Sequence, residues 1–267
     1  MAENKKHNVL TRIAAALVLA PLTIGLLYMG FPYATILLLF VGTLLAWEWS
    51  KMLAGDDETT CALTYSFAMT IAVLVNPFYG VYSFYGIFLS MLCGAVFLFW
   101  KTHNKEHCFL KVLGVPYIAV GIGSLMWIYQ LVGFEGILWF LILVWSVDIG
   151  GYVVGSTLRG PKLAPKISPN KTWAGLFGGM LFAAVASYFY AQAFDWARFE
   201  NYALIAMGLA VFEQIGDLVE SAIKRHLGLK DSSNLIPGHG GVFDRVDGLI
   251  FTAPILYLLL LYFPKLF

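Results

Sequence analysis

Long apolar segments without charge alternate with short polar segments along almost the whole chain. Nine of the apolar segments approach the ~20 residues that an α-helix needs to cross a bilayer. Backbone polar groups in lipid must be satisfied within a helix or a closed barrel, and the alternating pattern of barrel strands is absent. The segments therefore predict membrane-spanning α-helices. The predicted spans are residues 12–30, 31–49, 62–77, 82–100, 110–132, 134–157, 174–196, 202–223 and 248–264.

Composition supports the membrane class. Hydrophobic residues make up 60% of the 267 residues and charged residues only 12%, against roughly 45–50% and about 25% in soluble domains. The first segment follows Lys5, Lys6 and Arg12 and could imitate a signal peptide, but it lacks a convincing cleavage site and further spans follow closely. We therefore expect an all-α, polytopic integral membrane protein whose first helix is retained.

The basic residues predict the orientation, because cytoplasmic loops of membrane proteins are enriched in Lys and Arg. If the N-terminus is cytoplasmic and nine spans alternate, 15 of the 17 basic residues fall inside, and only Arg198 and Lys265 fall outside. The same asymmetry supports the eighth span, whose hydropathy alone is doubtful. Without that span, the basic segment that follows it would lie outside.

Polar groups are distributed unevenly between the two halves of the chain. Residues 1–133 are apolar helices with short connections, and their acidic segment 55–58 is expected to be a solvated turn. Residues 134–267 contain two long polar loops, 158–173 and 224–247, and acidic residues inside helices. We predict one continuous membrane domain, with N-terminal helices in the first half and cytoplasmic catalytic loops in the second.

The eighth predicted helix carries a stripe of charge. Glu213, Asp217, Glu220 and Lys224 are spaced by four, three and four residues, which places them on one helical face. Asp217 would lie about 10 Å inward of Lys224, where an isolated carboxylate is costly unless it is hydrated, paired or bound to metal. Two interpretations stay open: an interhelical ion-pair stripe, or the wall of a cytoplasmic cavity that holds a cation. Asp148 of the sixth span adds a fourth carboxylate.

The first polar loop combines rigidity with groups that can donate to phosphate. It contains three prolines and the sequence Ser-Pro-Asn-Lys-Thr, in which Ser168, Lys171 and Thr172 are candidate phosphate ligands. Thr172 could also cap the next helix. An ordinary basic loop that faces lipid headgroups is the alternative.

The second polar loop combines anion donors with carboxylates. Its glycines, among them Gly240 and Gly241, permit positive φ, and successive N–H groups in such conformations can bind anions. Asp244 and Asp247 are three residues apart at the start of the last helix, so they can share a face. Carboxylates beside phosphate ligands suggest Mg²⁺. His239 is either a donor or proton relay, or it only orders the turn.

Together these features predict phosphoryl or nucleotidyl transfer at the cytoplasmic interface, a chemistry that depends on positioning and charge neutralisation. No Ser–His–Asp or Cys–His arrangement is supported, and the P-loop motif is absent. The rival hypothesis is a transporter for cations or phosphorylated solutes that uses the acidic stripe. The D-G-x-x-A-R pattern of CDP-alcohol phosphotransferases is absent, and no nucleic-acid partner is expected.

Residues 221–247, SAIKRHLGLKDSSNLIPGHGGVFDRVD, resemble the signature of the phosphatidate cytidylyltransferases, also called CDP-diacylglycerol synthases. That pattern is S-x-apolar-K-R, four residues, K-D, small and apolar positions, P-x-H-G-G, and D-R-apolar-D. The matching positions are Ser221, Lys224, Arg225, Lys230, Asp231, Pro237, His239, Gly240, Gly241, Asp244, Arg245 and Asp247.

The resemblance implies a reaction in phospholipid biosynthesis: CTP and phosphatidic acid give CDP-diacylglycerol and pyrophosphate. It implies dependence on Mg²⁺, with a second cation left open. It also implies a multi-pass protein of the bacterial cytoplasmic (inner) membrane, in contact with membrane lipid, whose active site faces the cytoplasm. A homodimer is suggested as well.

The resemblance assigns residues too. It implies that Asp217 and Asp244 hold the metal. The segment SPNKTWAG resembles the family motif S-P-x-K-T-x-E-G, with Ala174 where the motif has glutamate. The expected catalytic residues are Asp217, Asp244, Lys224, Arg225 and Asp247. The expected substrate-binding residues are Ser168, Lys171, Thr172, Ser221, Lys230, Asp231, His239, Gly240, Gly241 and Arg245.

Overall fold

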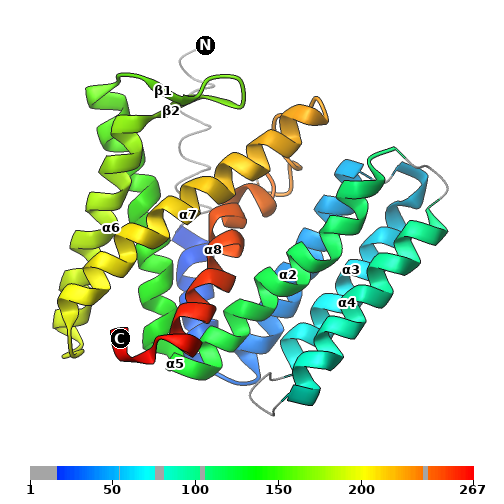
Figure 1. Cartoon of the computed structure of the whole chain (residues 1–267), viewed down its shortest axis with the longest axis horizontal. Coiled ribbons are helices and arrows are strands. Elements are labelled where there is room, and N and C mark those ends of the chain that lie inside the picture. The colour runs from blue at the N-terminus through cyan, green and yellow to red at the C-terminus, as the bar shows by residue number, and fades with distance from the viewer. Residues whose placement is uncertain (1–16, 54, 76–80, 103–105, 237–239) are drawn as a thin grey trace. The chain divides into compact units, whose positions relative to one another are not determined.

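Helices account for most of the backbone in the computed structural model (Figure 1), which describes residues 17–53, 55–75, 81–102, 106–236 and 240–267. The short helices are Leu17–Met29 and two 3-10 turns, η1 (Gly55–Asp57) and η3 (Pro264–Leu266). The others are α2 (Tyr33–Leu53), α3 (Glu58–Leu74), α4 (Val81–Lys101), α5 (Cys108–Leu158), α6 (Trp173–Ala193), α7 (Phe199–His226) and α8 (Phe243–Tyr262).

Each predicted span overlaps a helix of the described residues, while positions 12–16 of the first span and 76–77 of the third lie outside those residues. Five of these helices, α2, α5, α6, α7 and α8, are long and apolar enough to cross a membrane, which makes this a multi-pass membrane protein. The largest boundary difference is at the last span, because α8 begins at Phe243 and so includes both Asp244 and Asp247. Likewise α7 continues to His226, so Lys224 and Arg225 belong to its last turn and not to a loop.

Helix α5 is two helices joined at one glycine. Gly133 has φ 68° and ψ −164°, which is not helical. Glycine reaches such positive φ values without the steric cost that a Cβ imposes. The break falls between the predicted spans 110–132 and 134–157, so the prediction of two separate helices in this region is confirmed.

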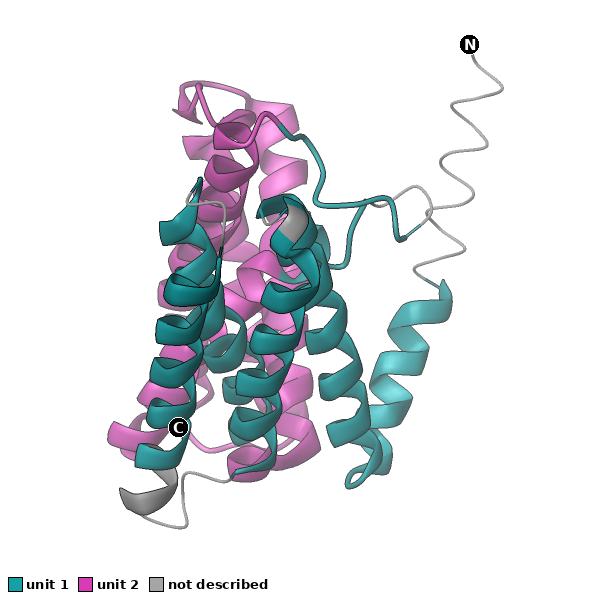
Figure 2. Ribbon diagram, turned by 90° about the vertical axis from the view of Figure 1, so that its right-hand side faces the viewer, with its two compact units in different colours: residues 1–127, 229–246 teal, residues 128–228, 247–267 magenta. Residues whose placement is uncertain are grey.

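The chain divides into two compact units (Figure 2). One consists of residues 1–127 and 229–246, and the other of residues 128–228 and 247–267. The divisions fall within α5, after α7 and within α8.

A buried ion pair lies in the first unit. The Lys111 side chain is 0% exposed, and its Nζ lies 3.4 Å from Oδ2 of Asp57, which is itself buried. The expectation that segment 55–58 is a solvated turn is therefore wrong at Asp57. The physical reason is that a buried ammonium group needs a counter-charge beside it, and Asp57 supplies that charge.

A β-hairpin in the second unit is the one strand pair among the described residues. Strands β1 (Lys162–Ala164) and β2 (Ser168–Thr172) pair antiparallel within the polar loop before α6. These strands were not predicted from the sequence. The sequence did predict the cap that follows them: Thr172 Oγ1 accepts a hydrogen bond from the N–H of Gly175 at 3.0 Å, so the N-cap of α6 is confirmed.

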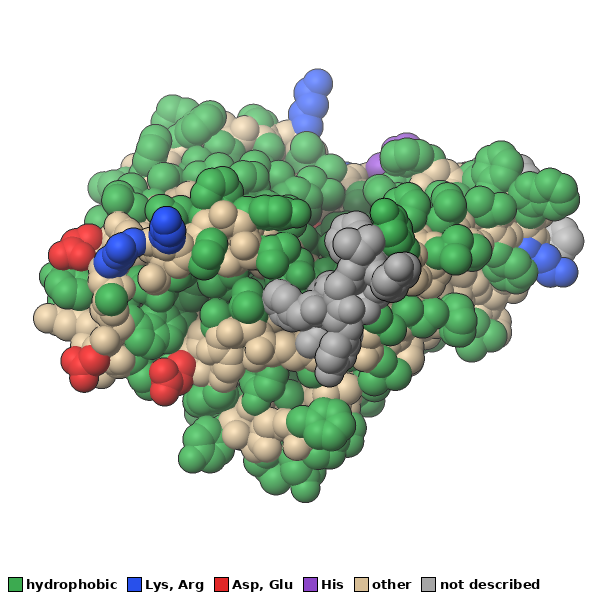
Figure 3. All heavy atoms as spheres, turned by 60° about the horizontal axis from the view of Figure 1, so that its bottom comes forward, with side chains coloured by type: hydrophobic (Ala, Val, Ile, Leu, Met, Phe, Trp, Pro, Cys, Tyr) green, Lys and Arg blue, Asp and Glu red, His purple; other side chains and the backbone are tan. Residues whose placement is uncertain are grey.

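Many large apolar side chains are exposed. Phe40, Trp100 and Phe189, on three different helices, are each more than half exposed. Hydrophobic side chains also dominate the face shown in Figure 3. Apolar surface on this scale is unusual for a soluble monomer and is typical of contact with lipid.

Candidate functional site

Three carboxylates from α7 and α8 meet in the second unit. One oxygen each of Asp217, Glu220 and Asp247 lies within 4.8 Å of the others. Glu220 is buried, and the two aspartates are partly buried. Negative charges at this spacing repel one another unless a cation neutralises them, and carboxylate oxygens are the ligands that Mg²⁺ prefers. The donor set therefore fits a divalent cation.

Two glycines allow the close helix approach that forms this cluster. A Cβ on Gly216 of α7 would lie 2.6 Å from Cβ of Phe251, and a Cβ on Gly248 of α8 would lie 2.7 Å from Oε1 of Glu213. Neither position can carry a side chain without displacing its neighbour. The packing of α7 against α8 at these glycines places Asp217 beside Asp247.

We expect Gly248→Ala to destabilise the protein by about 1–3 kcal/mol, because the added methyl group overpacks the α7–α8 contact. Gly208→Ala is the matched control, since nothing lies within 4 Å of a Cβ at that position. The control should be neutral or stabilising by up to about 1 kcal/mol through helix propensity. Thermal unfolding in detergent measures both changes, and equal Tm values for the two variants would contradict the packing argument.

Basic side chains already neutralise part of the acidic cluster. Nζ of Lys171, from β2, lies 2.6 Å from Oδ2 of Asp217. Nζ of Lys224 lies 2.6 Å from Oε2 of Glu220, one turn away on α7. Two carboxylates of the stripe therefore form ion pairs, one within α7 and one with the hairpin, and the same two belong to the potential metal-binding cluster. Neither pair joins two helices as the first interpretation supposed, and the cytoplasmic cavity of the second stays a prediction.

Polar contacts hold the hairpin and the end of α7 together. Arg225 Nε donates to the carbonyl oxygen of Ile167 at 3.3 Å. Ser221 Oγ donates to Oδ1 of Asp217 at 3.2 Å. The carboxylate of Asp148 in α5 interacts electrostatically with that of Asp247, so it adds negative charge to the surroundings of the acidic cluster. Eight predicted site residues are therefore gathered in this unit: Ser168, Lys171, Thr172, Asp217, Ser221, Lys224, Arg225 and Asp247.

The remaining described site residues belong to the first unit: Lys230, Asp231, Gly240, Gly241, Asp244 and Arg245. Asp244 Oδ2 accepts hydrogen bonds from the N–H of Gly241 at 2.8 Å and from the N–H of Ser232 at 3.0 Å. The predicted metal pair, Asp217 and Asp244, is divided between the units, so its pairing stays a prediction. Pro237, Gly238 and His239 lie outside the described residues, and the role of His239 also stays a prediction.

The N–H groups at the end of the glycine-rich segment bind carboxylates of the chain itself. Gly241 donates to Asp244, while Val242 and Phe243 donate to Glu48 of α2 at 2.9 Å and 2.7 Å. The predicted phosphate contacts of Gly240 and Gly241 are not tested by these bonds. Glu48 was not among the residues predicted from the sequence to have a role. A glutamate within the otherwise apolar run AWEW was the available signal.

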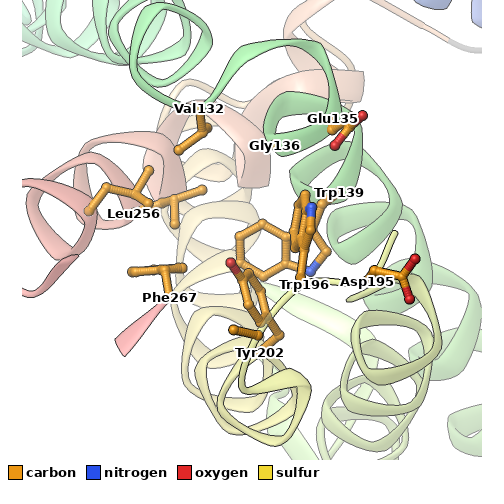
Figure 4. Close-up of a pocket in the computed structure, with 11 residues that line it drawn as sticks. Val132, Glu135, Gly136, Trp139, Asp195, Trp196, Tyr202, Leu256 and Phe267 are labelled. Carbon is orange, nitrogen blue, oxygen red and sulfur yellow. The ribbon is translucent and has the colours of Figure 1, made fainter. Parts of the chain in front are cut away.

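A separate cavity of about 420 Å³ lies in the second unit where α6 connects to α7. Trp139, Trp196 and Tyr202 form its aromatic wall (Figure 4), and the ring centroids of Trp196 and Tyr202 are 4.8 Å apart. The lining includes Asp195 but none of the clustered carboxylates. Trp and Tyr are enriched where helices meet the membrane surface, so we assign this cavity no part in the chemistry.

Comparison with known proteins covers almost the whole chain. A sequence model of the Cytidylyltransferase family matches residues 10–263. The phosphatidate cytidylyltransferase of Brucella suis biovar 1 (strain 1330) is 34% identical over 255 residues, which cover 94% of this chain and 93% of the relative. The protein of the same description from Pseudomonas aeruginosa is 34% identical over 277 residues, covering 93% and 96%. That from Bacillus subtilis (strain 168) is 47% identical over 132 residues, covering 49% of each chain.

Proposed function

The chain belongs to the cytidylyltransferase family, and from this premise we infer that it is a nucleotidyltransferase acting on CTP and phosphatidate. It transfers the cytidylyl group of CTP to phosphatidate and forms CDP-diacylglycerol and pyrophosphate, a step of phospholipid biosynthesis. The observation that carries this conclusion is the similarity to phosphatidate cytidylyltransferases along 94% of the chain. The resemblance of residues 221–247 to that family is confirmed.

The topology extends this proposal. We propose nine membrane crossings with a cytoplasmic N-terminus, in the bacterial cytoplasmic membrane, with the reaction at the cytoplasmic face. Support comes from the agreement of each predicted span with a helix and from the uneven distribution of basic residues. A homodimer is the quaternary state that the family resemblance suggests.

The proposed metal cofactor is Mg²⁺, bound at the acidic cluster. Asp217, Glu220 and Asp247 offer three carboxylate oxygens within 4.8 Å of one another, which suits Mg²⁺ held by carboxylates and substrate phosphates. Bound there, Mg²⁺ would supply positive charge against the triphosphate. Asp244 stays proposed as a metal ligand on the family resemblance, and a second cation stays open.

The chain's own residues neutralise and orient the reactants. The phosphate monoester of phosphatidate attacks the α-phosphorus of CTP in line, so one P–O bond forms while the bond to pyrophosphate breaks. A lipid phosphate is already anionic near neutral pH, so no strong general base is required. Lys171, Lys224, Arg225 and Arg245 are proposed to neutralise the triphosphate and the lipid phosphate. Ser168 and Thr172 stay proposed as hydroxyl ligands of phosphate.

A reconstituted assay tests this function. Purified protein in liposomes receives labelled CTP, phosphatidate and Mg²⁺, and equal amounts of CDP-diacylglycerol and pyrophosphate are expected. Absence of product across several lipid compositions would overturn the proposal. The transporter alternative predicts uptake of cations or phosphorylated solutes by the same liposomes without product.

Lys171 provides a further prediction. We expect Lys171→Met to lower the Mg²⁺ concentration for half-maximal activity, because the ammonium group and the metal compete for Asp217. The same substitution should lower kcat by roughly 100-fold, because a cation that offsets developing charge is lost. Lys166→Met, at an exposed position between the two strands, is the control. An unchanged Mg²⁺ requirement in Lys171→Met would contradict the competition.

A further inference from the structure

Glu48 is a fully buried carboxylate near the C-terminal end of α2, with 0% of its surface exposed. A buried charge is costly unless hydrogen bonds replace the lost water. At Glu48, four donors provide such hydrogen bonds. Oε1 accepts from Val242 N–H at 2.9 Å and from Ser233 Oγ at 2.5 Å. Oε2 accepts from Phe243 N–H at 2.7 Å and from Ser232 Oγ at 3.3 Å.

These bonds supply a helix cap that the local sequence lacks. The first N–H groups of a helix have no intrahelical acceptor, and negative charge is favourable at that end. Val242, directly before α8, has an apolar side chain that cannot accept a hydrogen bond. Glu48 lies 194 residues away along the chain and fills this role for α8. The start of α8, the helix that carries Asp244, is therefore stabilised by a side chain of α2.

The same carboxylate binds the glycine-rich part of the signature, residues 232–243, at both of its ends. Ser232 and Ser233 precede the glycines, while Val242 and Phe243 follow them, and Glu48 binds all four. Between these ends, the N–H of Ile236 donates to the carbonyl oxygen of Gly240 at 2.8 Å. Glu48 thus holds the described residues on both sides of the glycines.

Ser232 connects Glu48 to Asp244. Its Oγ lies 3.3 Å from Oε2 of Glu48 and 3.1 Å from Oδ2 of Asp244. A hydroxyl has a single hydrogen, so it donates to one carboxylate at a time. The N–H of Ser232 also donates to Asp244, at 3.0 Å. The position of the Asp244 carboxylate therefore depends on the segment that Glu48 holds.

Gly241 gives independent support from the signature itself. A Cβ on Gly241 would lie 2.6 Å from Oε1 of Glu48, so a glycine is required there for the carboxylate to approach the backbone. Aromatic packing beside Glu48 further restrains the start of α8. Phe243 is fully buried and meets Trp49, the neighbour of Glu48, edge to face at a centroid distance of 5.4 Å.

We propose that Glu48 is a positioning residue for cytidylyl transfer: it fixes both ends of the glycine-rich part of the signature (residues 232–243) and the start of α8, and through Ser232 it holds Asp244 in its working position. This inference rests on the proposed function. It assigns a task in the reaction to α2, outside the motifs that identify the family in this sequence.

The experiment compares Glu48→Gln, Glu48→Asp and the control Glu58→Gln in full-length protein. Glu58, in the first turn of α3, takes no part in the contacts described above. Glu48→Gln keeps the shape but loses the charge and places amide hydrogens against N–H donors. We expect kcat to fall about 100-fold, with the KM values for CTP and phosphatidate within about threefold of the original protein. Glu48→Asp should recover part of kcat, and Glu58→Gln should leave it unchanged.

Amide hydrogen exchange in detergent provides a readout that needs no catalysis. Loss of the bonds to Glu48 should speed exchange at Val242 and Phe243 by roughly tenfold to 100-fold, while amides in the middle of α8 keep their protection. Unchanged exchange at Val242 and Phe243 in Glu48→Gln would overturn the anchoring. Faster exchange with an unchanged kcat would overturn the role in the reaction. If the original protein formed no CDP-diacylglycerol, the proposed function would fail, whereas the exchange data would still decide whether Glu48 anchors the segment.

Discussion

Replacing Asp217 by asparagine is expected to lower kcat for CDP-diacylglycerol formation by roughly a thousandfold or more. The reason is that the charged groups around the reacting phosphates act together, so the loss of one of them removes most of their combined effect on the rate. Asp217 is a member of the acidic cluster and also the partner of Lys171 and Ser221. Asparagine keeps the shape of the side chain but removes the charge. Rates at saturating substrate, together with calorimetric titration of Mg²⁺ or Mn²⁺, would measure the loss of activity and of metal affinity.

The control for this substitution is Asp195→Asn. Asp195 is an exposed carboxylate in the aromatic cavity, away from the acidic cluster, and its replacement should change kcat by less than about twofold. Near-normal activity in Asp217→Asn would remove Asp217 from the proposed metal site. Asp244→Asn is expected to lower product formation to a similar extent, and a folded, active Asp244→Asn variant would remove Asp244 from the proposed metal site in the same way.

The second large effect concerns stability. Lys111→Met should lower the free energy of unfolding by about 3–5 kcal/mol, because it leaves the buried Asp57 carboxylate without its counter-charge. Replacing both partners, as in Asp57→Leu with Lys111→Met, should recover most of that loss, since an apolar pair of similar volume carries no desolvation penalty.

Thermal unfolding of the two single variants and the double variant in detergent forms a double-mutant cycle. The expected result is a low Tm for Lys111→Met and a Tm near the original for the double variant. Additive losses would show that the two side chains act independently, against the ion pair seen in the first unit.

Local features of the chain were predicted well because they depend on neighbouring residues. A run of apolar residues determines a membrane helix by itself, since the backbone must bond within the segment. The break at Gly133 and the cap at Thr172 are also local, and both agree with the structure. The hairpin within the polar loop was missed, because its short strands carry no clear alternation of apolar and polar residues.

For the acidic stripe, the common helical face could be predicted but the residues that contact it could not. Spacing along one helix was enough to place Glu213, Asp217, Glu220 and Lys224 on a common face. The partners of that face come from other elements: Lys171 from the hairpin and Asp247 from α8. Nothing in the spacing along α7 could identify Glu220 as a neighbour of Asp247.

From the amino-acid sequence alone we could infer the membrane class, the positions of the helices, the family and the segment that carries its signature. Each of these depends on composition, periodicity or a short motif. The three-dimensional structure was needed to see which carboxylates cluster, that Asp57 and Lys111 form a buried pair, and that Glu48 caps a helix 194 residues away. The physical reason is that a buried charge is stabilised by whichever groups surround it in space, and packing between distant helices sets those groups.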